Sequence, residues 1–314
     1  MPDIPRVFHQ IWFPLKGPNM PVKYDRNHRA WKEMNPEWEV RLWTHEQVRN
    51  LIATEYPCFL PTYDSYEAWV QRTDAARYFI LHKYGGVYAD LDYSALVPLE
   101  TMLRWLEDEA GDADVWCNLT KNAPPFGLWF SQSLIFSRKQ ASLWKIAHRL
   151  LVERRRAGTW LGHNRHVLLS TGPGFMDALS QRLIRARRGK ELFPLPTEKF
   201  NPCGLCDRGS QCTHGSFAVH ELSGSWMGEM TAMDAILAAI SCDWPLLSVI
   251  LLLGVVLFVV LFRDTQIPRY CGMKPRDGEP PAPALSRTRS GRWQFLGMTL
   301  LRTGQTDHRE RSNS

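Results

Sequence analysis

Two aspartates, Asp90 and Asp92, are spaced so that they could do chemistry together. They lie at the end of a short apolar stretch, residues 87–91, that follows Gly85 and Gly86 and is predicted to form a β-strand. Side chains at i and i+2 of a strand point the same way, so both carboxylates would face one crevice. Oxygen ligands of this kind hold Mg²⁺ or Mn²⁺ against a diphosphate, and a nucleotide sugar is the obvious ligand. The alternative is a pair of solvated turn residues.

The segment before this strand is predicted to be a helix over residues 71–84, and it carries a charged pair. Asp74 and Arg77 are three residues apart, so they share one face of the helix and would lie beside the strand end. The other face is apolar, with Trp69, Ala76, Phe79 and Ile80, and it is expected to pack on the sheet.

The first 140 residues alternate between predicted strands and predicted helices. Strands are expected over residues 7–12, 39–43, 87–91, 114–119 and 133–136, and helices over 25–34, 44–55 and 71–84. This alternation predicts an α/β fold with a parallel-dominated sheet and helices on both faces. Ligands of such sheets bind at the carboxyl ends of the strands, where Asp90 and Asp92 are expected.

Further motifs accompany the aspartate pair in a fixed order. They are IPRVFHQIW at 4–12, NPEWEVRLWT at 35–44, the helix residues Arg72, Asp74, Arg77 and Tyr78 with Gly85 and Gly86, STGPGF at 170–175, and HELSGSW at 220–226. Together they resemble the glycosyltransferases that have a DXD sugar-binding region, the family of yeast Golgi mannosyltransferases and mannosyl phosphorylinositol ceramide synthases. The resemblance covers roughly residues 4–230, and the joint occurrence is far more specific than any one motif.

The resemblance implies a Rossmann-like GT-A fold and a retaining glycosyltransferase that uses a UDP- or GDP-sugar. It implies that Asp74 and Arg77 contact the ribose and the sugar hydroxyls, the alternative being a salt bridge on a helix surface. Asp92 is expected to bind Mn²⁺ or Mg²⁺ directly, and Asp90 through water or the ribose. The metal would stabilise the departing nucleoside diphosphate as a Lewis acid.

Other site residues are expected from the first strand and from the HELSGSW motif. Trp12, at the end of the first strand, lines the base pocket by resemblance to related metal-dependent glucosyltransferases, or else is a core tryptophan. His220 would close the metal site, and the alternative for this lone histidine is a structural role. Ser225 and Trp226 would cover the diphosphate.

An apolar segment near the C-terminus divides the chain. Residues 246–262 are seventeen apolar or small residues without a charge, which predicts a transmembrane helix over 244–262, with a buried core helix as the alternative. A catalytic domain over 1–242 would precede it and a basic, disordered tail over 263–314 would follow. The tail holds ten Lys/Arg against five Asp/Glu and so most of the net charge of +6. The catalytic portion is therefore nearly neutral, and nucleic acid is not an expected partner.

The signals for membrane topology disagree. Lys and Arg are absent from residues 224–243 but present at Arg263, Arg269, Lys274 and Arg276, so the positive-inside rule places the tail in the cytosol and the catalytic domain in the lumen. The N-terminus, however, has no apolar signal sequence. The sequence thus predicts a single-pass protein of the ER or Golgi, with the side of the catalytic domain undecided.

Three cysteines lie close together in a Gly-rich segment. Cys203, Cys206 and Cys212, with His214 or His220, have the ligand types of a zinc site. The alternative is a loop with free thiols or disulfides.

The acceptor is expected to be lipophilic. A membrane span beside the catalytic domain raises the effective concentration of an amphiphilic acceptor, such as a sphingolipid or a terpenoid-like metabolite. Other hypotheses are a Golgi mannosyltransferase that acts on glycans and a catalytically inactive nucleotide-sugar-binding module, against which the intact Asp74, Arg77, Asp90 and Asp92 argue. A metal-dependent phosphodiesterase would need further His or Asp ligands.

Overall fold

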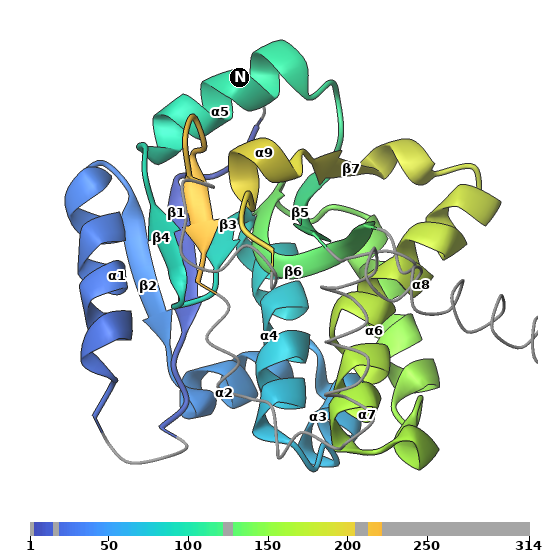
Figure 1. Ribbon diagram of the computed structural model, residues 1–314. Helices are drawn as coiled ribbons and strands as arrows, with labels where there is room; N and C mark the ends of the chain where they lie inside the picture. The colour runs from blue at the N-terminus through green and yellow to red at the C-terminus, as the bar shows by residue number, and fades with distance from the viewer. Residues whose placement is uncertain (1–2, 15–18, 122–127, 205–212, 222–314) are drawn as a thin grey trace, which may run out of the picture. The chain divides into compact units, whose positions relative to one another are not determined.

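The computed structural model describes residues 3–14, 19–121, 128–204 and 213–221 (Figure 1). The chain divides into two compact units, Met1–Gly254 and Val255–Ser314, and the described residues all belong to the first. The predicted transmembrane helix and basic tail lie outside the described residues. Within the described ranges, no helix is long and apolar enough to cross a bilayer.

A six-stranded mixed sheet forms the centre of the first unit. Its strand order is β2 (Glu39–Trp43), β1 (Val7–Ile11), β3 (Gly86–Ala89), β6 (Leu128–Ser137), β5 (Val115–Lys121) and β7 (Leu192–Leu195). The pairs β1–β2, β1–β3 and β5–β7 are parallel, whereas β6 is antiparallel to β3 and β5. The connection between β5 and β6 is residues 122–127, and a parallel crossover needs about a dozen residues or more. The predicted α/β class is confirmed, with β6 as an antiparallel exception.

Helices cover both faces of this sheet, and each face has its own apolar core (Figure 1). One layer contains α2 (His45–Glu55), α3 (Leu60–Asp64), α4 (Trp69–Tyr84), α6 (Leu143–Arg154), α7 (His163–Ser170) and α8 (Pro173–Arg185). The other contains α1 (Val22–Met34), α5 (Leu99–Glu109) and α9 (Thr197–Phe200). Strand alternation separates the cores, because Tyr88 of β3 joins the first whereas Val87 and Ala89 join the second.

A small second sheet stands beside the main one. It pairs β4 (Tyr93–Ala95) with β8 (Ala218–His220) in antiparallel register. The two strands are far apart in the sequence, so this sheet brings His220, the first residue of the HELSGSW motif, next to the turn that follows β3.

Gly85 and Gly86 allow α4 to end and β3 to begin without a loop. Their φ angles are +66° and +90°, a region that side chains with a Cβ rarely adopt. A Cβ on Gly86 would also lie 2.2 Å from the carbonyl oxygen of Val7 on the neighbouring strand. Only glycine therefore fits the start of β3.

The predicted apolar face of α4 is confirmed in part, because Ala76, Phe79 and Ile80 are buried in the core but Trp69 is not. The helix is buried on most of its sides, because α2, α6 and α7 pack around it as well as the sheet. Trp69, expected on the packed face, is 41% exposed. It is the first residue of α4, and its ring contacts the ring of His45 edge-on and lies under the Arg72 guanidinium.

Candidate active site

Asp90 and Asp92 lie in a tight turn that follows β3. The backbone N–H of Asp90 donates to the Ser133 carbonyl at 2.8 Å, and the N–H of Tyr93 donates back to the Asp90 carbonyl at 3.0 Å. The strand was predicted to reach residue 91, but β3 ends at Ala89. The two carboxylates are therefore brought together by a β-turn rather than by strand alternation.

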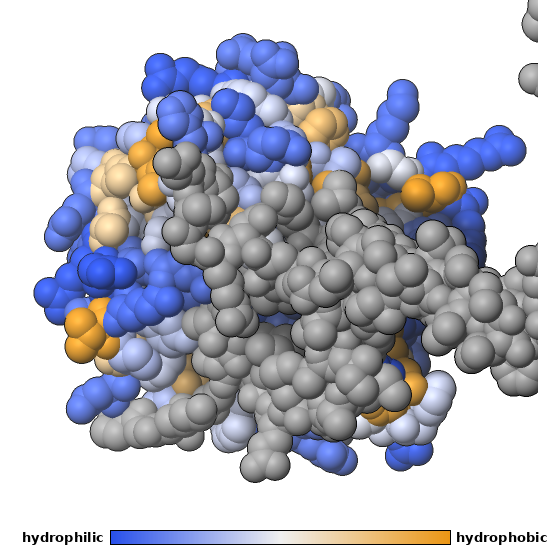
Figure 2. Space-filling view, in the orientation of Figure 1, coloured by the Kyte–Doolittle hydropathy of each residue, from blue (hydrophilic) through white to orange (hydrophobic). Residues whose placement is uncertain are grey.

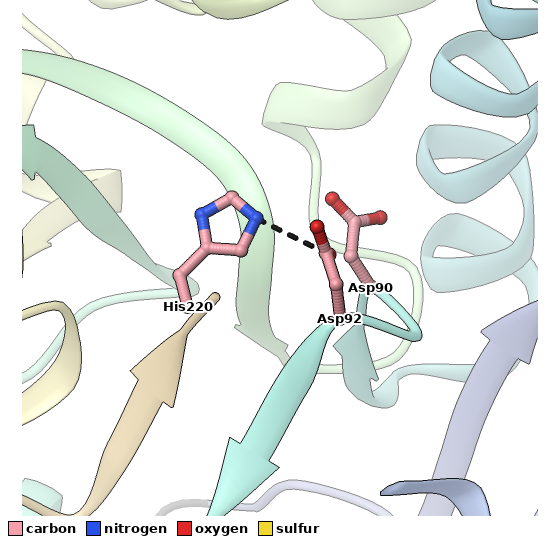
Figure 3. Close-up of side chains that lie close together, drawn as sticks. All are labelled: Asp90, Asp92 and His220. Atoms are coloured by element: carbon pink, nitrogen blue, oxygen red, sulfur yellow. Dashed lines mark ion pairs between the residues drawn. The ribbon is translucent and has the colours of Figure 1, made fainter. Parts of the chain in front are cut away.

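His220 completes a three-residue cluster with this turn (Figure 3). One ligand atom from each of Asp90, Asp92 and His220 lies within 4.8 Å of the others, and Nε2 of His220 is 3.2 Å from Oδ1 of Asp92. Burial lowers the pKa of His220, but the hydrogen bond to Asp92 and the charges of both carboxylates outweigh it and raise the pKa overall. Two carboxylates and an imidazole are thus held where a cation could contact all three.

The place of His220 is set by the small sheet. Tyr93 of β4 pairs with His220 of β8, and their rings stack with centroids 5.1 Å apart. The N–H of the next residue, Glu221, donates to the carbonyl of Asp92 at 2.9 Å. Backbone and ring contacts together hold the imidazole against the aspartate turn.

Glu221 and Asn27 form a network that the sequence did not predict. The Glu221 carboxylate accepts hydrogen bonds from Nδ2 of Asn27, at 3.1 Å, and from the Ser94 hydroxyl, and it pairs with Lys23. Nδ2 of Asn27 also donates to the carbonyl of Leu91 at 3.2 Å. The network therefore joins α1, the aspartate turn and β8, although nothing in the local sequence marks Asn27.

Arg77, which is buried, connects α4 to the same turn through two ion pairs. Its Nη2 is 2.8 Å from Oδ1 of Asp74, and its Nη1 is 3.2 Å from Oδ1 of Asp90. The guanidinium also lies over the ring of Tyr88, whose hydroxyl donates to Asp90 at 2.6 Å. Burial raises the pKa of Asp90, and the charge of Arg77 opposes that rise.

Asp74 is held on both of its oxygens. Besides Arg77, the hydroxyl of Thr171 donates to Oδ2 at 3.0 Å and Nε2 of Gln132 lies 3.4 Å from Oδ1. The alternative, a salt bridge between Asp74 and Arg77, is therefore present, but both residues are buried and the pair does not lie on the helix surface. Thr171 belongs to STGPGF, which places that motif beside the site. The contacts of Asp74 and Arg77 with a donor stay a prediction.

Trp12 lies at the carboxyl end of β1, next to the strand that leads to Asp90. The register pairs His9 with Tyr88, which puts Trp12 on the same sheet edge as the aspartate turn. Trp12 is only partly buried, and its ring meets that of Tyr24 edge-on at 6.2 Å. The side chain is therefore at the edge of the core rather than within it, and its role toward a base stays a prediction. Ser225 and Trp226 lie outside the described residues.

The cysteine segment is described only in part. Cys203 is disulfide-bonded, so its thiol is not available as a zinc ligand. Cys206 and Cys212 lie outside the described residues.

The comparisons with known proteins agree with the motifs. Residues 21–112 match the family described as "Glycosyltransferase sugar-binding region containing DXD motif". Inositol phosphoceramide mannosyltransferase 3 of Schizosaccharomyces pombe is 42% identical over 102 residues, which are 32% of this chain and 28% of that protein. Inositol phosphoceramide mannosyltransferase 2 of the same yeast is 34% identical over 184 residues, 59% of this chain and 48% of that protein. The matched part is thus less than half the length of either relative.

Among solved structures, mouse xyloside xylosyltransferase 1 in its apo form is similar with a TM-score of 0.45 and 11% identity, over 70% of this chain and 98% of that one. At this TM-score and identity, the match supports no conclusion about the function of this chain. The sequence matches confirm the predicted resemblance: the chain carries the DXD sugar-binding region of glycosyltransferases, and its relatives are glycosyltransferases.

Proposed function

We propose that this chain is a metal-dependent, retaining glycosyltransferase of the GT-A type. It moves a hexosyl or N-acetylhexosaminyl unit from a UDP- or GDP-sugar to a hydroxyl of a lipophilic, membrane-associated acceptor. The observation that carries the proposal is the cluster of Asp90, Asp92 and His220, which stands at the carboxyl edge of β1 and β3. Asp90 and Asp92 also lie within the residues that match the DXD family.

The cluster suits Mn²⁺ or Mg²⁺ by its donor set. Carboxylate oxygens are the preferred ligands of both ions, and an imidazole is tolerated better by Mn²⁺. When bound, the cation supplies positive charge that stabilises the departing nucleoside diphosphate. The contact between Nε2 of His220 and Oδ1 of Asp92, which are 3.2 Å apart, would have to give way before both atoms could act as ligands.

The protein groups around the cluster have positioning roles. Arg77 and the Tyr88 hydroxyl both bind Oδ1 of Asp90, which fixes that carboxylate. Tyr93 fixes the ring of His220 by stacking. Asp74 and Arg77 would meet the ribose and the sugar hydroxyls, and Trp12 would meet the base. With no carboxylate assigned as a base, the leaving phosphate takes the proton of the acceptor hydroxyl, as the resemblance implies.

A lipid acceptor is supported by the relatives. Both fission-yeast proteins are named for mannosyl transfer to inositol phosphoceramide, so a sphingolipid with a GDP-mannose donor is the first pair to test. A terpenoid-like acceptor with a UDP-sugar is the second. We place the enzyme in the ER or Golgi membrane as a single-pass protein.

The test is the release of nucleoside diphosphate by the full-length chain in detergent. A panel of UDP- and GDP-sugars is assayed with Mn²⁺, with and without inositol phosphoceramide, beside Asp92→Asn and a matched surface control, Asp112→Asn. We expect turnover of one donor that falls at least roughly 100-fold in Asp92→Asn and is unchanged in the control. Equal activity in Asp92→Asn, or no binding and no turnover of any donor, would overturn the proposal.

A further inference from the structure

Positive charge is concentrated in one part of the first unit. Residues 143–191 contain eleven Lys/Arg against three Asp/Glu, whereas residues 1–142 contain fifteen against eighteen. Residues 1–142 thus carry a net charge of −3, and residues 143–191 carry a net charge of +8. That segment comprises α6, α7, α8 and the connections between them.

These helices pack together, so the charge forms one surface. Arg182 of α8 pairs with Glu153 of α6, and Nε of Arg154 on α6 donates to the Leu169 carbonyl of α7 at 2.9 Å. Figure 1 shows the three helices side by side in the layer that also holds α4. The solvent-facing side chains that we call the basic face are Lys145, Arg149, Arg156, Arg182 and Arg185, all exposed.

A cleft of about 600 Å³ opens on this face between α6 and α8. Arg154, Arg182 and Arg185 line it, with Leu150 and Ala178 as its apolar part. Guanidinium groups bind phosphate oxygens in pairs, so the cleft suits a phosphodiester headgroup. The acidic lining residue, Asp177, accepts a hydrogen bond from the backbone N–H of Phe130 at 3.0 Å.

Large apolar side chains are exposed on the same helices. Trp160, in the 3-10 turn Thr159–Leu161, is 84% exposed, Ile184 of α8 is 66% exposed, and Val152 of α6 is 50% exposed. Figure 2 shows hydrophobic surface beside projecting hydrophilic side chains on the right-hand side of the molecule. Exposed Trp and aliphatic residues among Arg and Lys are typical of helices that lie in a membrane interface. The bases of a nucleic acid could stack on Trp160, but the aliphatic side chains of Ile184 and Val152 offer them no stacking surface.

We propose that the basic face, with Trp160, Val152 and Ile184, docks on the anionic surface of a lipid bilayer. The arginines bind phosphodiester headgroups, the cleft receives one of them, and the apolar side chains enter the headgroup boundary. This contact would hold the folded domain against the membrane through its own surface. The inference goes beyond the proposed sugar transfer and does not depend on the donor.

The test measures hydrogen exchange of the full-length chain in nanodiscs of phosphatidylcholine alone or with a third of phosphatidylserine. The triple variant Arg149→Glu, Arg156→Glu, Arg185→Glu is compared with a control of equal charge change, Lys32→Glu, Arg104→Glu, Lys139→Glu, whose residues are exposed and lie outside the basic segment. Each Lys or Arg near an anionic surface strengthens binding roughly fivefold. Removing three of them is therefore expected to weaken docking by roughly 100-fold or more.

We expect peptides over 149–161 and 181–188 to exchange more slowly in anionic nanodiscs only, and 0.5 M salt to remove the difference, because exposed charges are screened. The control should behave like the unmodified chain and the triple variant should show no protection. Equal protection in both lipids, no protection in either, or stronger protection by single-stranded RNA would overturn the proposal. None of these readings uses a sugar donor, so a failure here is separate from a failure of the proposed function.

Discussion

Tyr93 and His220 face each other across the two-stranded sheet of β4 and β8, with ring centroids 5.1 Å apart and planes 10° from parallel. Tyr93 is itself fixed, because its hydroxyl donates to the Phe200 carbonyl and receives a bond from Nδ2 of Asn118 at 3.2 Å. A rigid tyrosine in the core thus sets the plane of an imidazole at the candidate metal site. The site depends on a contact between segments more than a hundred residues apart.

Glu221→Ala should weaken Mn²⁺ binding although Glu221 is not in the metal cluster. Its carboxylate holds Asn27, Ser94 and Lys23, and loss of such supporting contacts typically costs 10- to 100-fold in metal affinity. Isothermal titration with Mn²⁺ measures the effect, with His220→Ala expected to be weaker still. Glu33→Ala, at an exposed position of α1, is the control. Affinity in Glu221→Ala equal to that of the control would refute the positioning role.

Arg77→Met should destabilise the fold strongly. The substitution would remove the guanidinium that pairs with the carboxylates of Asp74 and Asp90. Removing one partner of a buried ion pair costs about 3–5 kcal/mol. Arg29→Met removes an exposed i,i+4 pair with Asp25 and should cost no more than about 1 kcal/mol. Urea unfolding of both variants gives the comparison. Similar losses in the two would mean that the Arg77 pairs contribute no more than a surface contact.

Local rules account for much of the fold and part of the site. Spacing alone placed Asp74 beside Arg77 on one helix face, and the Gly85-Gly86 pair marked where α4 ends. The resemblance supplied His220, whose approach to Asp92 no local pattern contains. The sequence missed the turn at Asp90 because strand alternation does not say where a strand ends.

The supporting residues Asn27 and Glu221 could not be predicted from the sequence, for a different reason. Asn27 contacts Glu221 across 194 residues of sequence, and such polar pairs leave no periodic trace in a single chain. The antiparallel direction of β6 could have been inferred from the short connection after β5. The basic face was not predicted from the sequence, because the net charge of the domain sums its basic segment with its acidic ones.

Gly86→Ala should destabilise the protein far more than Gly111→Ala. Both glycines have positive φ, +90° and +62°, so both substitutions carry the backbone strain of about 1 kcal/mol. Only at Gly86 does the new Cβ meet a backbone atom, the Val7 oxygen at 2.2 Å, whereas at Gly111 it meets nothing within 4 Å. Thermal unfolding should show a small loss for Gly111→Ala and failure to fold or a large loss for Gly86→Ala. Equal losses would mean that φ alone matters at the start of β3.

Two histidines, the buried His9 and the partly buried His148, should make the fold sensitive to acid. Nδ1 of His9 accepts a hydrogen bond from Nε1 of Trp43 at 3.1 Å, which leaves Nε2 to donate to the Gly85 carbonyl at 3.0 Å. Burial lowers the pKa of His9 to about 3, and burial with the nearby His82 lowers the pKa of His148 to about 3. Both rings are therefore neutral in the folded state near pH 7.

The sign of the effect follows from proton binding. Unfolded histidines have a pKa of about 6.5, so below that pH the unfolded chain binds protons that the folded chain does not. The neutral rings make their full contribution to the free energy of unfolding above about pH 6.5. This contribution falls as the pH drops toward 3.

Urea unfolding between pH 7.5 and 4.5 tests this prediction with His148→Phe. The ring of His148 stacks on Phe79 with centroids 3.8 Å apart, so a phenyl ring keeps the packing and removes the titration. The variant should lose less stability than the unmodified chain over this range, because one of the two groups no longer takes up a proton on unfolding. Parallel losses in the two proteins would show that His148 titrates alike in the folded and unfolded states, and acid sensitivity would then have to come from other groups.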